Sequence, residues 1–304
     1  VWRPRGLSLV LGPSNFPLHL LHGLVVPALA VGCTVLAKPS ERCPSLGAAY
    51  ARCLEAAGLA GVCRVVQGDA HLVDALLDLD RLAVVAAVGG AAMGEALHRR
   101  MAGRTAVILA LELGGVNHAL VRGDADADAT AIAIADGAWR MAGQRCTATR
   151  IVHVPAADLD AWLHRLGDLR RQWRPGASPE ALAGPMVDTR VDPLLLTATA
   201  ADDPWLHHER FGPALVVCPY SDEAAAVAAM QANPWRLSCS IFTRDDAAFV
   251  RLAAVLPYGI VNRNRPTAGA RSDLPFGGCG RSGNGRPAAL AAAQIFADET
   301  VVWG

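Results

Sequence analysis

The first third of the chain alternates short apolar segments with helix-forming segments, and this alternation constrains the fold more than any other feature. Strands are predicted at 7–12, 33–37, 62–68, 82–88 and 107–113, and helices at 18–31, 44–57, 70–78 and about 90–101. The strand segments are almost continuously apolar, which is typical of strands buried on both faces of a parallel sheet. Because helices connect these strands, the pattern predicts an α/β fold with helices covering the sheet.

A second α/β region follows Gly114 and Gly115. Strands are predicted there at 151–155, 213–220, 238–243 and 259–264, and helices at 125–141, 156–171, 221–232 and 245–255. The stretch 173–206 has little periodicity and is predicted to be a loop, as is the glycine-rich stretch 277–285. We therefore expect two domains, 1–113 and 114–304, the second ending in a loop tail.

Composition excludes several classes of protein. The 304 residues carry 28 basic and 28 acidic side chains, a balance that argues against nucleic acid or an anionic membrane as partner. The longest largely apolar stretch, 24–37, is interrupted and too short to cross a bilayer. The eight cysteines show neither CxxC nor zinc-like spacing. We expect no metal site, and free thiols in a reducing, cytoplasmic compartment.

Polar groups follow several predicted strands of the first region. Asn15 follows the first strand, Lys38 the second and Gly89-Gly90 the fourth. In open α/β folds, ligands bind at the carboxyl ends of the strands. Each signal is weak by itself: Asn15 could be a turn former, the Lys38 segment a solvated helix start, and the glycines an ordinary turn at a helix N-terminus.

Two further residues are candidates for chemistry. Cys146 lies in GQRCT among small and polar residues, and the preceding Arg145 would favour its thiolate form. The alternative is a buried structural cysteine. Glu112 ends an apolar strand just before two glycines, where a desolvated carboxylate could act as a general base. An exposed carboxylate at the strand end is an equally good interpretation.

The motifs become specific when they are taken together and in order. GPSNFP, TVLAKPSE, LELGG, GQRCT, ERFGP and PFGGCGRSG resemble the motif series of the NAD(P)-dependent aldehyde dehydrogenase superfamily, from about residue 3 to residue 290. The resemblance implies a Rossmann-type cofactor domain within 1–113 and an α/β catalytic domain within 114–304. It also implies an enzyme that oxidises a small-molecule aldehyde with NAD, or alternatively NADP.

The resemblance implies a role for each catalytic candidate. Cys146 matches the nucleophile, Glu112 the general base and Asn15 the donor that stabilises the oxyanion. The reaction would pass through a cysteine thiohemiacetal and a thioester, which Glu112 would help water to hydrolyse. The cofactor would be bound by Lys38 and Glu41 at the adenosine ribose and by Glu209 and Phe211 at the nicotinamide. The turn holding Gly89, Gly90 and Gly94 would bind phosphate.

A finer resemblance concerns the substrate. GQRCT, GIVNRNRPTAGA and GRSGNGRP look most like the succinylglutamate-semialdehyde dehydrogenases of arginine catabolism. This implies N-succinylglutamate 5-semialdehyde, or a similar semialdehyde, as substrate. Guanidinium groups can bind its two carboxylates, and four arginines flank the motifs: Arg145, Arg263, Arg265 and Arg271.

The sequence also departs from the family pattern. Family members have a long segment before GPSNFP, whereas this chain begins at Val1, about a dozen residues before it, so both domains are expected to be incomplete and the chain to be a processed form or a fragment. The stretch from 184–188 to 208–213 is short, and the usual FTGS turn is AVGG, with Gly90 replacing serine. The family suggests a homodimer or homotetramer, but the assembly segments look truncated. The alternative function is a truncated, catalytically silent relative that acts as a binding or interaction protein.

Overall fold

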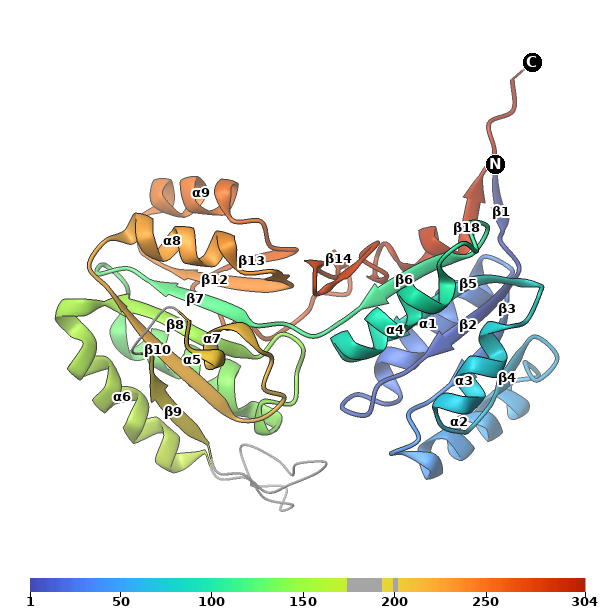
Figure 1. Ribbon diagram of the computed structural model, residues 1–304, viewed down its shortest axis with the longest axis horizontal. Helices are drawn as coiled ribbons and strands as arrows, with labels where there is room; N and C mark the ends of the chain where they lie inside the picture. Colours follow the sequence, from blue (N-terminus) through green and yellow to red (C-terminus); the bar gives the residue numbers. More distant parts are fainter. Residues whose placement is uncertain (174–192, 199–201, 304) are drawn as a thin grey trace. The chain divides into compact units, whose positions relative to one another are not determined.

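A computed structural model describes residues 1–173, 193–198 and 202–303, and the chain forms two compact units (Figure 1). Unit 1 comprises Val1–Leu113, Arg271–Gly277 and Gly283–Gly304, and unit 2 comprises Gly114–Ala270 and Gly278–Ser282. Each unit is built on a six-stranded sheet in which most neighbouring strands are parallel. The expected α/β class with parallel sheets is therefore confirmed.

The sheet of unit 1 has the order β16-β6-β5-β2-β3-β4. Its strands are β2 (Leu7–Leu11), β3 (Thr34–Lys38), β4 (Cys63–Val65), β5 (Leu82–Val88), β6 (Ile108–Glu112) and β16 (Gly283–Asn284). All pair in parallel except β16, which runs antiparallel to β6. The parallel strands end at one edge, where Leu11 of β2 lies beside Lys38 of β3 and Val88 of β5 lies beside Glu112 of β6.

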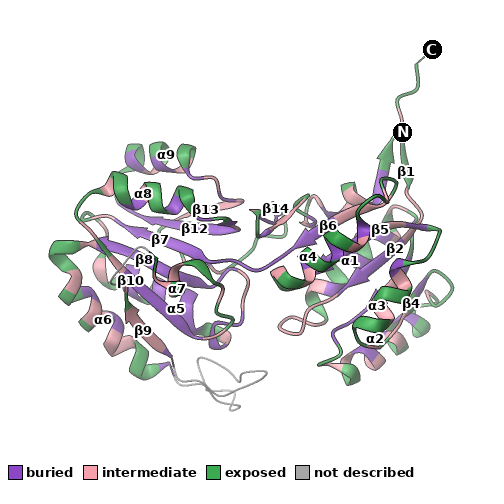
Figure 2. Cartoon of the chain, in the orientation of Figure 1, coloured by how far each residue is buried: buried purple, intermediate pink, exposed green. Residues whose placement is uncertain are grey.

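Helices cover both faces of this sheet. They are α1 (His19–Ala30), α2 (Pro44–Ala56), α3 (Ala70–Leu77) and α4 (Ala91–Met101). Alternate residues of each strand enter two separate cores, because successive side chains of a strand point to opposite faces. Val10 packs with α1 and α2, whereas Leu9 and Leu11 pack with α3 and α4. Figure 2 shows the result: buried strands between helices that expose their outer faces.

The sheet of unit 2 has the order β13-β12-β7-β8-β10-β9 and is parallel throughout. Its strands are β7 (Asn117–Val121), β8 (Thr149–Pro155), β9 (Leu194–Thr197), β10 (Ala214–Tyr220), β12 (Ser238–Phe242) and β13 (Ile260–Arg263). The helices α5 (Ala127–Trp139) and α6 (Leu159–Gln172) pack on one face, and α8 (Glu223–Ala232) and α9 (Asp246–Val255) on the other. Trp139 is fully buried in the larger of these cores.

The sequence analysis did not predict several elements of unit 2, among them β7, β9 and α7 (Pro204–His207). Strand β7 lies in the middle of the sheet, but it begins with Asn117 and His118, whose buried polar side chains hide it from a search for apolar runs. The stretch predicted as a loop, 173–206, contains β9 and the start of the short helix α7. The residues 184–188, where the chain departs from the family pattern, lie outside the described part.

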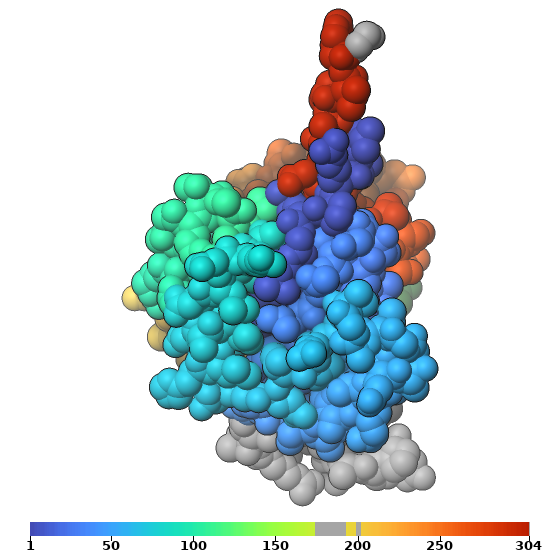
Figure 3. All heavy atoms as spheres, turned by 90° about the vertical axis from the view of Figure 1, so that its right-hand side faces the viewer, coloured from blue at the N-terminus to red at the C-terminus, as the bar shows by residue number. Residues whose placement is uncertain are grey.

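The tail was assigned to the wrong unit. We expected the whole of 114–304 to form one domain, but Arg271–Gly277 and Gly283–Gly304 belong to unit 1. Pairing with unit 1 strands explains this: β16 extends the sheet beside β6, and β18 (Ala297–Glu299) pairs with β1 (Trp2–Pro4). Figure 3 shows these two chain ends side by side on unit 1.

The remaining elements of the tail are short. They are β14 (Pro275–Phe276), β15 (Cys279–Gly280), β17 (Ala288–Ala289) and the 3₁₀ segment η3 (Ala292–Phe296). Phe296 is fully buried in the core beneath α1, and its carbonyl accepts a hydrogen bond from the Cys33 thiol at 3.2 Å. In unit 2, β11 (Trp235–Arg236) pairs with β15. Across the described residues, no helix combines the length and the hydropathy that crossing a membrane requires.

Candidate functional site

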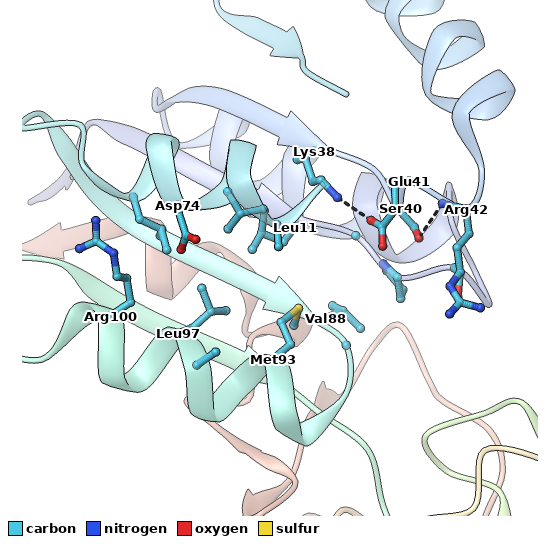
Figure 4. Close-up of a pocket in the computed structure, with 18 residues that line it drawn as sticks. Leu11, Lys38, Ser40, Glu41, Arg42, Asp74, Val88, Met93, Leu97 and Arg100 are labelled. Atoms are coloured by element: carbon cyan, nitrogen blue, oxygen red, sulfur yellow. Dashed lines mark hydrogen bonds and ion pairs between the residues drawn. The ribbon is translucent and has the colours of Figure 1, made fainter. Parts of the chain in front are cut away.

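A cavity of about 420 Å³ opens at the carboxyl edge of the unit 1 sheet (Figure 4). The loops after β2, β3 and β5 form one side, and α3 and α4 form its walls. Its lining residues include Leu11, Gly12, Pro13, Ser14, Lys38, Ser40, Glu41, Arg42, Val88, Gly89, Met93, Leu97 and Arg100. The cavity lies where open α/β sheets bind their ligands, and the expected placement of Lys38 and Gly89 at strand ends is confirmed.

An ion pair stands at one end of this cavity. Lys38 Nζ lies 2.7 Å from Glu41 Oε2, and Figure 4 shows the two side chains pointing toward each other. Lys38 is buried, whereas the Glu41 carboxylate is more than half exposed. The hydrogen bond from Lys38 lowers the pKa of Glu41. The pair therefore offers a fixed ammonium donor and a carboxylate acceptor, which suits the hydroxyl groups of a sugar.

The glycine turn after β5 leads into α4. Gly90 is the N-cap residue with an extended backbone (φ −81°, ψ 159°), and it has no side chain to accept from the first N–H groups of the helix. Gly94 is needed for packing, because a Cβ there would come within 2.5 Å of Leu113 Cδ1. A Cβ at Gly90 would meet no described atom within 4 Å. Such a helix start is suited to phosphate.

Glu112 and Asn15 also belong to unit 1. Glu112 is the last residue of β6 and is 1% exposed. Its carbonyl accepts a hydrogen bond from Gly89 N at 3.0 Å, and Gly283 pairs with it from β16. Asn15 lies in the bend after β2, next to Ser14 of the cavity lining, and is half-buried. The interpretation of Glu112 as an exposed carboxylate is therefore wrong.

Cys146 lies in unit 2, in a loop between α5 and β8. The preceding 3₁₀ segment η1 (Arg140–Gly143) contains three successive residues with left-handed backbone angles, Met141, Ala142 and Gly143 (φ 55°, 51° and 65°). Non-glycine residues seldom adopt this conformation. Cys146 is partly exposed, so it is not enclosed in the core as Cys33, Cys63 and Cys239 are. All eight cysteines are free thiols, as expected.

Backbone contacts hold Cys146 in position. Asn117 of β7 donates from Nδ2 to the Cys146 carbonyl at 2.8 Å and to the Ala148 carbonyl at 2.9 Å. Thr267 donates from Oγ1 to the Thr147 carbonyl at 2.7 Å. Neither residue was among the sequence candidates, because Asn117 lies outside the motifs, Thr267 lies in GIVNRNRPTAGA without being singled out, and each acts across more than 25 positions of chain.

Glu209 is bound by the glycine pair that opens unit 2. Gly115 N donates to Glu209 Oε1 at 3.0 Å, and a Cβ at Gly114 would lie 1.9 Å from Glu209 Oε2. Burial raises the pKa of Glu209, while the charge of Arg150 and the Gly115 hydrogen bond lower it. The neighbouring Phe211 is 43% exposed. Because Gly114 and Gly115 have no side chains, the Glu209 carboxylate can lie against their backbone, close to Cys146 O and the Asn117 side chain.

Arg150 is a further functional candidate that the sequence analysis missed. Its guanidinium is buried and donates to three carbonyl groups: Gly212 O at 2.6 Å, Gly143 O at 2.7 Å and Arg145 O at 3.3 Å. Burial lowers the pKa of Arg150 to about 10, while the charges of Glu209 and Cys146 raise it. The only feature of the sequence that could have indicated this role is the position of Arg150, four residues after Cys146.

The four arginines suggested for substrate have different surroundings. Arg271 makes two hydrogen bonds to Asp273, at 3.0 and 2.6 Å, and Arg263 pairs with Asp246. Arg145 is half-buried beside Met141, and burial lowers its pKa. Arg265 is exposed and lies two residues before Thr267, which contacts the residue after Cys146.

The described structure thus assembles the candidate residues into two groups. Lys38, Glu41 and Gly89 line one cavity in unit 1, and Gly90, Gly94, Asn15 and Glu112 lie in the same unit. Cys146, Glu209, Phe211, Arg145 and Arg265 lie in unit 2. A parallel sheet with helices on both faces and a cavity at its carboxyl edge defines the open α/β ligand-binding folds.

Comparison with known proteins gives the family. The sequence profile of the Aldehyde dehydrogenase family matches residues 1–191 and 189–302. The chain is 37% identical over 330 residues to N-succinylglutamate 5-semialdehyde dehydrogenase 1 from Caulobacter vibrioides, covering 97% of this chain and 70% of that protein. It is 36% identical over 333 residues to N-succinylglutamate 5-semialdehyde dehydrogenase from Salmonella heidelberg, covering 97% and 67%. The chain therefore belongs to the aldehyde dehydrogenase family, whose members are oxidoreductases.

Solved structures agree with this assignment. The gamma-glutamyl-gamma-aminobutyraldehyde dehydrogenase from Burkholderia cenocepacia superimposes with a TM-score of 0.93 at 26% identity, covering 98% of this chain and 68% of that one. A structure described as giving insight into cofactor and substrate selection by Gox0499 superimposes with a TM-score of 0.94 at 26% identity, covering 100% and 74%. The expected family and its fold are confirmed.

Proposed function

We propose that this chain oxidises a semialdehyde to a carboxylate, with Cys146 as nucleophile and a nicotinamide dinucleotide as cofactor. The observation that carries the proposal is the setting of Cys146: a partly exposed thiol on a loop held by Asn117 and by the buried guanidinium of Arg150, which donates to the Arg145 carbonyl and whose pKa the charge of Cys146 raises. A fixed thiol near positive charge is an activated nucleophile.

The residues at the carboxyl edge of unit 1 fit a dinucleotide. Lys38 and Glu41 would bind the adenosine ribose through its hydroxyl groups, and the start of α4 at Gly90 would bind phosphate. We favour NAD over NADP, because the Glu41 carboxylate would repel a 2′-phosphate. Glu209 and Phe211 of unit 2 would bind the nicotinamide end. The bound nicotinamide supplies a hydride acceptor.

Each catalytic candidate then has one task. The Cys146 thiolate attacks the aldehyde carbon and forms a thiohemiacetal. The Asn15 amide donates a hydrogen bond to the new oxyanion. After oxidation, Glu112 takes a proton from the water that hydrolyses the thioester and so releases the carboxylate.

For the substrate we propose N-succinylglutamate 5-semialdehyde, which two similar proteins are named for. Arg145 and Arg265 are the arginines we propose to bind its carboxylates, because Arg145 directly precedes Cys146 and Arg265 lies two residues before Thr267, which contacts Thr147. Guanidinium groups bind carboxylates with two parallel hydrogen bonds, which gives preference for an acidic substrate.

The test measures NAD⁺ reduction with N-succinylglutamate 5-semialdehyde and with neutral aldehydes of similar length, together with the mass of the peptide that holds Cys146 after turnover is trapped. We expect turnover with the acidic substrate, a covalent adduct on Cys146, and loss of both in Cys146→Ala. Cys53→Ala, which removes an exposed thiol of unit 1, is the control and should stay active. Turnover by Cys146→Ala would refute the nucleophile, and equal efficiency with neutral aldehydes would refute the substrate. NAD binding without oxidation would instead favour the binding-protein alternative.

A further inference from the structure

Arg150 carries a buried positive charge, and the three hydrogen bonds of its guanidinium all go to neutral carbonyl groups. It is 4% exposed, and its three acceptors are backbone carbonyls. Its Nε is buried without a hydrogen-bond partner in the ranges the structure describes. A buried charge is strongly unfavourable unless neighbouring groups compensate it. The carbonyl groups accept hydrogen bonds from the guanidinium but do not neutralise its positive charge. The charge of Arg150 therefore affects the ionisation of nearby groups.

Two ionisable groups interact electrostatically with the charge of Arg150. Cys146 and Glu209 are the groups whose charges act on Arg150. Electrostatic attraction is mutual, so the guanidinium in turn favours the charged form of each of these two groups. One side chain thus links the proposed nucleophile to the proposed nicotinamide-binding carboxylate.

Arg150 also determines the shape of the loop that carries Cys146. Its Nη2 donates to Gly143, the third of three successive left-handed residues, and to Arg145, which precedes the cysteine. Left-handed conformations are unfavourable for non-glycine residues, so surrounding contacts must hold this segment in place. Its Nη1 donates to Gly212, three residues after Glu209. The two terminal nitrogens of the guanidinium, Nη1 and Nη2, therefore connect the loop that carries Glu209 with the loop that carries Cys146.

We propose that Arg150 is a positioning residue for this reaction, whose buried guanidinium holds the Cys146 loop against the Glu209 loop and places a positive charge between them. The inference rests on the proposed function for the meaning of the thiolate, but the contacts that carry it do not depend on which aldehyde reacts. Lysine has one charged head and cannot span the two loops, whereas methionine has similar length and no charge.

The test is the pH dependence of Cys146 alkylation by iodoacetamide without cofactor or substrate, followed by mass spectrometry of the peptide that contains Cys146. In Arg150→Met we expect the pH of half-maximal alkylation to rise by about 1, so that the rate at pH 7 falls about tenfold. In Arg150→Lys we expect the midpoint of the wild type, with kcat about tenfold lower and KM little changed because the loop is misplaced.

The control is Arg122→Met, which removes a partly buried arginine of unit 2 that pairs with Glu223 instead. It should lower thermal stability and leave the alkylation midpoint unchanged. A wild-type midpoint in Arg150→Met, or an equal shift in the control, would overturn the inference. If Arg150→Met does not fold, wild-type turnover by Arg150→Lys overturns it as well. Absence of aldehyde oxidation in the wild type, together with the expected alkylation shift, would refute the proposed function and leave the role of Arg150 intact.

Discussion

At the scale of single residues, burial and hydrogen bonding separate the candidates from one another. Glu112 and Lys38 are buried at the end of parallel strands, where a charged group is kept only if it is compensated or used. Cys146 differs from the enclosed cysteines in being partly exposed on a strained loop. The sequence singled out these residues as candidates, but Asn117, which holds the Cys146 loop, lies 29 positions away in the chain.

Glu112→Gln tests the division of labour between nucleophile and base. Glutamine keeps the size of the side chain but cannot take a proton from water, so thioester hydrolysis should slow by roughly 10²-fold or more. Hydride transfer should remain fast. Stopped-flow absorbance should then show a burst of reduced nicotinamide equal to the enzyme concentration, followed by slow turnover. Slow reduction with no burst would contradict the assignment.

A pair of buried histidines makes unit 2 sensitive to acid. Asn233 accepts a hydrogen bond from Trp235 N and donates one to Val116 O, which fixes the orientation of its amide. Its other N–H therefore donates to His118 Nε2 at 2.7 Å, and His118 Nδ1 donates in turn to His153 Nε2 at 2.9 Å. Both histidines are neutral in this arrangement, and protonation would break it.

Unit 2 should therefore lose stability as the pH falls. Burial lowers the pKa of His153 to about 4 and that of His118 well below its usual value, with the charges of His153 and then His207 adding to the effect on His118. In the unfolded chain both histidines regain a pKa near 6.5. The unfolded state then binds more protons between pH 6.5 and 4, so stability is complete above pH 6.5 and falls by up to about 1.4 kcal/mol per pH unit for each histidine below it.

Thermal unfolding at pH 7.5, 6 and 5 checks this expectation. His153→Gln should reduce the slope of stability against pH, because it removes one of the two groups. His164→Gln is the control, since the His164 side chain is 81% exposed on α6 and its loss should leave the slope unchanged. An equal slope in the wild type and in His153→Gln would contradict the explanation.

At the scale of elements, the carboxyl edge of the unit 1 sheet brings the cofactor candidates together. Parallel strands end at one edge, so residues that follow β2, β3 and β5 become neighbours although they are separated in sequence. This could be predicted, because the strands were recognisable as apolar runs. Strand β7 could not, because its first residues, Asn117 and His118, are buried polar groups with internal partners.

The start of α4 allows a substitution that should improve cofactor binding. Gly90→Ser places a hydroxyl at the N-cap, where serine accepts a hydrogen bond from the first turn, and the backbone there suits any residue. We expect a few tenths of a kcal/mol more stability, and tighter NAD⁺ binding because the hydroxyl can also donate to phosphate. Isothermal titration calorimetry measures the affinity.

Gly94→Ser, on the next turn of α4, is the contrasting variant. A Cβ there would meet Leu113 Cδ1 at 2.5 Å, so this change should destabilise unit 1 and give no gain in affinity. Equal or weaker NAD⁺ binding by Gly90→Ser than by the wild type would argue against phosphate binding at this turn.

At the scale of the whole molecule, the chain passes between its two units more than once, because the tail returns to unit 1. The proposed cofactor cavity lies wholly within unit 1, and the proposed nucleophile lies in unit 2. Cofactor binding and nucleophilic attack can therefore be tested separately, since binding of the cofactor should stabilise unit 1 even when Cys146 is replaced.

Titration with NAD⁺ should raise the temperature at which unit 1 unfolds. At a concentration one hundred times the Kd, binding to the folded state alone adds about 2.7 kcal/mol. Differential scanning calorimetry should show this shift with NAD⁺, a smaller one with AMP, and neither in Lys38→Met, which removes the ammonium group from the cavity. Cys146→Ala should respond as the wild type does. No shift with NAD⁺ in the wild type would contradict the assignment of the cavity.

The sequence by itself determined the alternation of strands and helices, the boundary after Leu113 and the placement of Lys38 and Gly89 at strand ends. These depend on local periodicity and on the polarity of neighbouring residues, which one chain segment contains in full. The tertiary structure decided that the tail belongs to unit 1, that β7 lies inside the second sheet, and that Arg150 reaches the loops of Cys146 and Glu209. Those results depend on contacts between distant segments, which are selected by packing and by the need to satisfy buried polar groups.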